Sequence, residues 1–210
     1  MSPVEVTAVA FGLACVILTI RQSIWSWPTG LVQVVLYIWI FKQARLYSDM
    51  VLHVIYVPMQ LYGWYHWLAG PRCEHAERLP IRRITGRAAL IWLVLSAAAI
   101  AADGYLMGRY FDAALPYWEA AIAVLSLVAQ YLLARKVLEN WALWITIDVI
   151  AIGVYWVKDI KLTSGLYAVF LLLACAGLIE WIRAYRRRVG QHGFDVVVPQ
   201  DPTRVRTGTP

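Results

Sequence analysis

The chain has 210 residues, of which 61% are hydrophobic and only 15% charged, and its mean hydropathy is +0.60. A soluble domain has roughly 45–50% apolar and about 25% charged residues, so this composition excludes an ordinary soluble domain. Three cysteines without a C-x-x-C pair indicate neither a disulfide scaffold nor a zinc site. The net charge of +6 does not indicate nucleic-acid binding, because the basic residues lie between apolar runs and near the C-terminus.

Seven apolar stretches long enough to cross a bilayer follow one another along the chain. The first contains Glu5, has no basic start and is followed by Arg21, so we do not expect it to be a signal peptide. We predict an all-α integral membrane protein with seven transmembrane helices. The expected spans are 4–20, 28–44, 49–69, 87–107, 117–134, 141–157 and 163–182.

The distribution of Lys and Arg predicts the orientation in the membrane. With seven crossings, fourteen basic residues lie on the C-terminal side and five on the N-terminal side. Basic loops stay in the cytoplasm, so we expect the N-terminus outside and the C-terminus inside. The five on the outer side are Lys42, Arg45, Arg109, Lys158 and Lys161.

The third and seventh spans end in the same pattern, a glycine followed four residues later by a tryptophan. Tryptophan-rich segments also open the second and sixth spans. These similarities predict an internal repeat, although membrane helices can also end in tryptophan without one. The aligned pairs are Gly63 with Gly177, Trp67 with Trp181, Trp27 with Trp144, and Tyr37 with Tyr155.

The repeat predicts two three-helix units joined by a linker helix. One extra crossing is needed because a unit of three helices ends on the side opposite its start. The two units are then parallel, and such transporters bind substrate near the midplane between the halves. The expected parts are a first repeat at 1–70, a basic cytoplasmic loop at 71–86, a linker helix at 87–110, a second repeat at 111–185 and a flexible cytoplasmic tail at 186–210.

An acidic residue, Asp148, lies near the centre of the sixth span. Placing Asp there costs about 2.5–3.5 kcal/mol on insertion scales, so it needs a partner or a function. Trp141, Trp144 and Tyr155 fall within about 60° of it on one helix face. We interpret this face as facing a ligand. The alternative is a helix–helix hydrogen bond from Asp148 with the aromatic residues as packing.

Other spans carry similar combinations of polar and aromatic residues. In the third span Gln60 shares a face with His53, Tyr56, Trp64 and Trp67, and Pro58 should kink the helix. Ser and Gln also hold membrane helices together, which is the alternative for the second and fifth spans. Those spans carry Gln33 and Tyr37, and Glu119, Ser126 and Gln130, respectively.

The sequence lacks the motifs that are typical of several function classes. There is no phosphate-binding G-x-x-x-x-G-K-[ST] loop, no H-E-x-x-H zinc pattern and no G-x-S-x-G nucleophile motif. We therefore expect no enzyme activity, no metal and no cofactor. A channel or an integral membrane enzyme remains the rival from another class, although the latter would need a cluster of titratable residues at one depth.

Taken together, the motifs over residues 5–185 resemble the PnuC family of bacterial vitamin transporters. Each is short, and their order and spacing carry the resemblance. They are Trp27-Pro28-x-Gly30, Leu36-Tyr37, Leu46-Tyr47-x-Asp49, Tyr62-Gly63-Trp64-x-x-Trp67, Ser126-x-x-x-Gln130, Glu139-Asn140-Trp141-x-x-Trp144-x-x-x-Asp148 and Gly177-x-x-x-Trp181.

The resemblance implies a SWEET-like arrangement of three, one and three helices, a homotrimer, and a place in the bacterial inner membrane. It implies facilitated diffusion of nicotinamide riboside, which a cytoplasmic kinase then traps by phosphorylation. Relatives with similar motifs carry thiamine, riboflavin or deoxynucleosides, so the cargo stays open among these.

The residues and the resemblance together give a set of candidate site residues. Since Asp148 has no second acid or histidine along its face, we expect uniport rather than proton coupling. The expected substrate contacts are Tyr37, Gln60, Trp64, Trp67, Ser126, Gln130, Asn140, Trp141, Trp144, Asp148 and Tyr155, and the expected hinge or packing residues are Pro28, Gly30, Pro58, Gly63 and Gly177.

Overall fold

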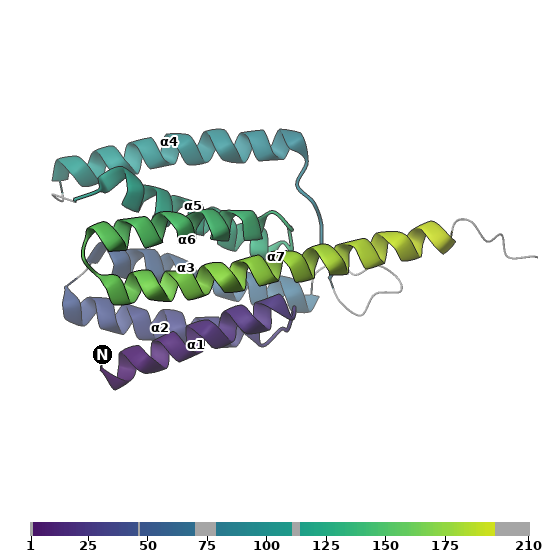
Figure 1. Cartoon of the computed structure of the whole chain (residues 1–210), viewed down its shortest axis with the longest axis horizontal. Coiled ribbons are helices and arrows are strands. Elements are labelled where there is room, and N and C mark those ends of the chain that lie inside the picture. The colour runs from purple at the N-terminus through teal and green to yellow at the C-terminus, as the bar shows by residue number, and fades with distance from the viewer. Residues whose placement is uncertain (1, 46, 70–78, 111–113, 196–210) are drawn as a thin grey trace, which may run out of the picture.

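The computed structural model describes residues 2–45, 47–69, 79–110 and 114–195. Within these ranges the chain forms seven helices, as the apolar runs predict (Figure 1). They are α1 (Pro3–Ile20), α2 (Ser26–Ala44), α3 (Tyr47–Ala69), α4 (Gly86–Tyr110), α5 (Pro116–Ala134), α6 (Asn140–Val157) and α7 (Lys161–Asp195).

Five of the described helices, α1, α4, α5, α6 and α7, are long and apolar enough to cross a membrane. The other two, α2 and α3, are also long enough but carry more aromatic and polar side chains. The helix α7 runs well beyond the bundle in Figure 1 and ends at Asp195, so the first ten residues of the expected tail are helical.

Local sequence explains where the helices begin. Before α1, the Glu5 amide donates to Ser2 Oγ at 3.2 Å and the Ser2 amide donates to Glu5 Oε2 at 2.9 Å, which forms a capping box. Proline occupies the first helical position at Pro3 and at Pro116, where its missing N–H is not needed.

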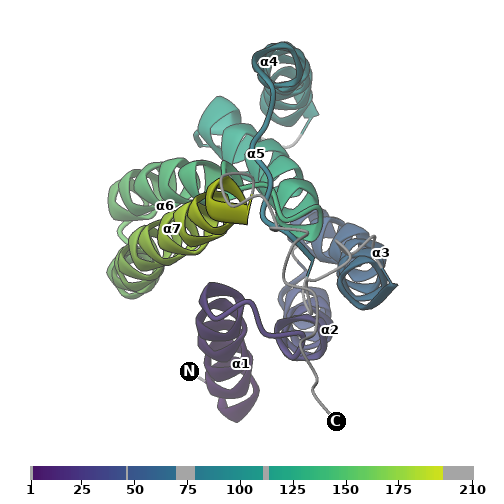
Figure 2. The ribbon, with the colours of Figure 1, turned by 90° about the vertical axis from the view of Figure 1, so that its right-hand side faces the viewer.

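The helices pack as two groups of three with α4 outside them. Within each group neighbouring helices pack in chain order, and α3 against α5 and α1 against α7 join the two groups. Among the described helices α4 contacts only α5, and Figure 2 shows it standing apart from the others. This is the expected arrangement of three, one and three helices.

The backbone shows the register between the two repeats. Gln22, Arg45, Lys136 and Asp159 have left-handed φ values of 53°, 58°, 51° and 58°, and each follows the end of a helix. Gln22 and Lys136 are 114 residues apart, and so are Arg45 and Asp159. Equivalent residues of the two repeats therefore differ by 114 in number.

This register corrects two of the expected pairs. Gly63 with Gly177 and Trp67 with Trp181 agree with it. The partner of Trp27 is Trp141 instead of Trp144, and Tyr37 corresponds to Ala151 instead of Tyr155. The physical reason is that Trp27 and Trp141 each lie against the glycine of their own repeat, as described next, whereas Trp144 lies one turn further along α6.

Candidate ligand-binding site

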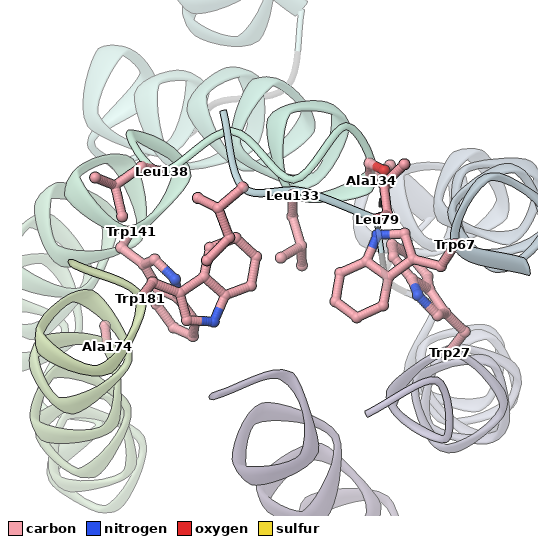
Figure 3. Packing of buried hydrophobic residues seen from close by; sticks show 10 residues of the cluster. Trp27, Trp67, Leu79, Leu133, Ala134, Leu138, Trp141, Ala174 and Trp181 are labelled. Atoms are coloured by element: carbon pink, nitrogen blue, oxygen red, sulfur yellow. Dashed lines mark hydrogen bonds between the residues drawn. The ribbon is translucent and has the colours of Figure 1, made fainter. Parts of the chain in front are cut away.

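One end of the bundle is filled by four tryptophans, Trp27, Trp67, Trp141 and Trp181, and we call it the tryptophan end (Figure 3). Each is at most 8% exposed. A Cβ atom at Gly63 would lie 2.0 Å from Cη2 of Trp27, and one at Gly177 would lie 2.4 Å from Cη2 of Trp141. Only glycine lets these indole rings approach the helices so closely.

The other two tryptophans connect the repeats. The Trp67 indole N–H donates to the Ala134 carbonyl of α5, and the Trp181 indole N–H donates to the Thr19 carbonyl of α1, both at 3.2 Å. The Trp67 and Trp181 rings also contact each other, with centroids 6.4 Å apart. The two halves are thus bonded to each other at this end.

A buried cation lies at the same level. Lys136 is 2% exposed, and its Nζ donates to Gln22 Oε1 at 3.3 Å and to the Leu79 carbonyl at 3.1 Å. Its Nζ also lies 4.4 Å from the centroid of the Trp67 ring, in cation–π geometry. The hydrogen bonds and the ring replace water around the charge.

Leu79 and Ile81, from the second half of the expected basic loop, pack in the core of the tryptophan end, and residues 70–78 lie outside the described ranges. The Arg82 amide donates to the Lys136 carbonyl and the Arg82 carbonyl accepts from the Leu138 amide, both at 2.9 Å. Glu139 accepts from the Ile84 amide at 3.0 Å and from Arg83 at 3.1 Å. This segment therefore covers the turn between α5 and α6.

Further along the bundle, five helices direct aromatic and polar side chains toward one another. The Tyr155 and Tyr167 rings of α6 and α7 stack with centroids 5.3 Å apart. The His53 ring contacts both Tyr37 of α2 and Tyr56 of α3, with centroids 5.3 Å and 5.8 Å from theirs. Ser126 of α5 and Asp148 of α6 are 6% and 4% exposed, and α5 packs against both α3 and α6. We call Tyr37, Tyr56, Ser126, Asp148, Tyr155 and Tyr167 the central cluster.

Asp148 is the acidic member of this cluster. It is 4% exposed, and its carboxyl makes no hydrogen bond or ion pair with the described residues. The expected alternative, a helix–helix hydrogen bond from Asp148, is therefore not formed within those residues. A buried carboxyl without a protein partner is costly, which fits a group that meets a bound molecule.

Two buried amides lie between the central cluster and the tryptophan end. Gln60 and Gln130 are 7% and 6% exposed. Gln60 packs on Gly30, where an added Cβ would lie 2.6 Å from its Nε2 atom. Trp64 and Trp144 are half-buried and pack against the tryptophan end. These four residues would form the floor of a site between the two repeats.

The structure places three of the predicted contact residues deeper than the sequence suggested. Trp67, Asn140 and Trp141 lie in the core of the tryptophan end, where the Trp67 indole N–H is already bonded. Asn140 is fully buried and donates to the Val137 carbonyl at 2.6 Å. The Asn140 Oδ1 atom and the Trp141 indole N–H are enclosed and have no hydrogen-bond partner among the described residues.

The sequence prediction missed Tyr167 and its neighbour Phe170. Their ring centroids are 6.1 Å apart, and Tyr167 completes the stack with Tyr155. The signal that would have found them is the repeat register, because Tyr167 and Phe170 occupy the positions of His53 and Tyr56 in the first repeat. The polar face of α3 was recognised, and the register carries it over to α7.

Comparison with known proteins shows the family of the chain. Residues 2–183 match the family described as "Nicotinamide mononucleotide transporter". The chain belongs to this family. It is therefore a multi-pass membrane transporter and not an enzyme.

Several members of the family are similar over most of their length. The nicotinamide riboside transporter PnuC of Escherichia coli K12 is 29% identical, over 90% of this chain and 88% of that protein. The riboflavin/roseoflavin transporter RibM of Streptomyces davaonensis is 24% identical, over 84% and 83%. A crystal structure of the vitamin B3 transporter PnuC superposes with a TM-score of 0.71 at 26% identity, over 88% and 82% of the two chains.

Proposed function

We propose that this protein takes up a vitamin nucleoside, nicotinamide riboside first, by facilitated diffusion across the bacterial inner membrane. The observation that carries the proposal is the buried Asp148 side chain, whose carboxyl has no described protein partner and which shares helix α6 with Tyr155 of the stacked Tyr155–Tyr167 pair. The names of the similar transporters support the same class of cargo.

The chemistry of the central cluster suits this cargo. Nicotinamide riboside carries a pyridinium charge, which the Asp148 carboxylate would balance. Ring faces of Tyr37, Tyr155, Trp64 and Trp144 would stack on the pyridinium ring, and each cation–π contact contributes about 0.5–2 kcal/mol. Gln60, Ser126 and Gln130 would bond the ribose hydroxyls, and Trp67, Asn140 and Trp141 would close the site from below.

A nucleotide fits this site poorly, although the family is described by one. No Lys or Arg belongs to the central cluster, and Lys158 at the far end of α6 is paired with Glu119 of α5. A phosphate dianion buried beside Asp148 would therefore meet a like charge instead of a partner. The dephosphorylated riboside avoids this repulsion.

Transport would require opening the tryptophan end. We infer that the Trp67–Ala134, Trp181–Thr19 and Lys136–Gln22 bonds close the path in this conformation and break together when the halves move apart. Gly30, Gly63, Gly177, Pro28 and Pro58 would allow the close packing or hinge motion that this needs. No second carboxylate or histidine follows Asp148 along α6, which favours uniport, with a cytoplasmic riboside kinase trapping the cargo.

The runner-up cargo is another vitamin, riboflavin or thiamine. The similarity to a riboflavin/roseoflavin transporter favours a flavin as the alternative. Riboflavin is neutral, so its binding would not need the Asp148 charge, whereas thiamine carries a thiazolium cation and would.

Uptake into proteoliposomes tests the function. Labelled nicotinamide riboside should enter saturably, and unlabelled riboside should compete while the mononucleotide should not. The same vesicles are offered riboflavin and thiamine. Absent riboside uptake together with saturable uptake of one of these vitamins would move the assignment to that vitamin. Flux that does not saturate, with single-channel conductance, would establish a channel instead.

We also propose a homotrimer with the N-terminus outside and the C-terminus in the cytoplasm. The resemblance supports the trimer, and the arginines at 183 and 186–188 of α7, on the same side as the basic loop, support the orientation. Mass measurement of the detergent complex and labelling of single cysteines at either end of α1 in intact cells test the two statements.

A further inference from the structure

A shallow groove of about 270 Å³ lies on the surface between α3 and α5, away from the central cluster. Pro58, Met59, Tyr62, Tyr131 and Ala134 line it. Apart from the tyrosine hydroxyls these side chains are apolar. The apolar lining of the groove suits a hydrocarbon chain.

Aromatic rings form the wall of the groove. The Tyr62 ring stacks on Tyr131 with centroids 6.4 Å apart and planes 6° apart, and on His66 with centroids 5.8 Å apart. On the other side Trp92 of α4 contacts Tyr131 at 5.4 Å. Such amphipathic rings are typical of the level at which lipid head groups meet the hydrocarbon core.

Positive charge gathers at the tryptophan end of the groove. Arg135 donates to the Tyr62 hydroxyl at 3.3 Å, His66 stacks on Tyr62, and the Arg82 amide donates to the carbonyl of Lys136, the residue after Arg135. Both arginines are exposed, and none of the ion pairs among the described residues includes either of them. Two arginines and a histidine thus lie at the end of an apolar groove without a carboxylate partner there.

The repeat shows that this arrangement is specific to one face. The equivalent interface, between α7 and α1, keeps the arginine as Arg21. There the positions of Tyr62, His66 and Tyr131 are occupied by Ala176, Glu180 and Ile17, and Glu180 pairs with Arg183 at 3.9 Å. General packing would be expected on both faces. The stacked rings are on one face only, and the other face carries a carboxylate, Glu180, at the position of His66.

We propose that this groove binds an anionic phospholipid, with an acyl chain along Pro58, Met59 and Tyr131 and the phosphate on Arg135 and Arg82. Guanidinium groups bind phosphate oxygens in a planar fork. Basic pockets between transmembrane helices bind anionic lipid head groups in this way. The bound lipid would hold α3 against α5. This is one of the two helix contacts that join the repeats.

Native mass spectrometry of the purified protein tests the lipid site, with phosphatidylglycerol and phosphatidylcholine added in turn. Phosphatidylglycerol should bind more tightly than phosphatidylcholine. Arg135→Gln should weaken phosphatidylglycerol binding about fivefold, the change expected for one arginine near a lipid surface. Arg135→Lys should restore part of it. Met59→Trp, which fills the groove, should weaken both lipids.

Arg21→Gln is the matched control, because Arg21 is the equivalent exposed arginine on the other face. It should leave phosphatidylglycerol binding unchanged. Equal weakening in Arg21→Gln and Arg135→Gln would overturn the proposal in favour of general surface attraction. Equal binding of the two lipids, or unaltered binding in Met59→Trp, would also overturn it. A changed number of protomers in Arg135→Gln would show that the groove is instead an interface between copies of the chain.

Discussion

Lys136 and Gln22 occupy the same position in the two repeats and are hydrogen-bonded to each other, with Lys136 Nζ 3.3 Å from Gln22 Oε1. Residues related by a two-fold axis can touch only close to that axis. Trp67 and Trp181, a second equivalent pair, contact each other at the same level. The pseudo-two-fold axis therefore passes through the tryptophan end, and motion of one half against the other must disturb these contacts.

The first prediction concerns the charge on this axis. Lys136→Met leaves the Leu79 carbonyl and the Gln22 amide oxygen without their donor in the core. An unpaired buried group costs about 1–3 kcal/mol, so thermal unfolding in detergent should begin at a clearly lower temperature. Arg21→Met removes an exposed cation one residue before Gln22 and should change the unfolding temperature little. If Lys136→Met and the parent unfold at the same temperature, the cation makes no net contribution to stability.

The second prediction tests the glycine contacts. In Gly177→Ala the new methyl would lie 2.4 Å from the rigid Trp141 ring, and overpacking of this kind costs roughly 1–3 kcal/mol. Gly63→Ala should destabilise the protein in the same way, because its new methyl group would meet the Trp27 ring. Gly165→Ala, in the same helix as Gly177, has no neighbouring atom within 4 Å and should be neutral or stabilising by up to about 1 kcal/mol. If all three variants unfold at one temperature, the close packing has no energetic role.

The helices were predictable from the sequence because membrane spans are long apolar runs, and each expected span lies inside or within a few residues of its helix. The repeat was also recognisable. Its register was not, because tryptophans were matched by their place along a span, while the true equivalence depends on which indole lies against which glycine. That contact joins residues 36 apart in the chain, Trp27 with Gly63 and Trp141 with Gly177.

The interior of the site was only partly predictable. Periodicity gave the polar faces of α3 and α6 correctly, since Gln60 and Asp148 are both buried. Periodicity does not give the position of a side chain along the long axis of the bundle. For this reason Trp67, Asn140 and Trp141 were grouped with residues nearer the centre. Nor did it indicate that Lys136, in a turn between spans, would be enclosed, because enclosure requires the Leu79 carbonyl and the Trp67 ring from elsewhere in the chain.

The third prediction uses the residue that the sequence missed. Tyr167→Ala removes the ring that stacks on Tyr155 and should weaken binding of labelled nicotinamide riboside by about tenfold, the effect of losing one aromatic contact worth roughly 1.4 kcal/mol. Tyr167→Phe keeps the ring and should lose less affinity for the riboside. Tyr105→Ala, on the exposed surface of α4, is the control and should bind like the parent. Unchanged affinity in Tyr167→Ala would place the cargo elsewhere.

The last prediction concerns Asp148 and energy coupling. A proton-coupled carrier needs a route for the proton to both sides, built from several titratable groups. No second carboxylate or histidine follows Asp148 along α6, and Glu119 of α5 is already paired with Lys158. Asp148→Asn keeps the shape but removes the charge that would balance the pyridinium. Losing a charge-assisted bond should weaken riboside affinity about tenfold or more, whereas Asp103→Asn on α4 should not. Transport in parent and variant should proceed only down the riboside gradient. If an inward proton gradient instead drove accumulation above the external level in kinase-free vesicles, and Asp148→Asn abolished it, the uniport proposal would be wrong.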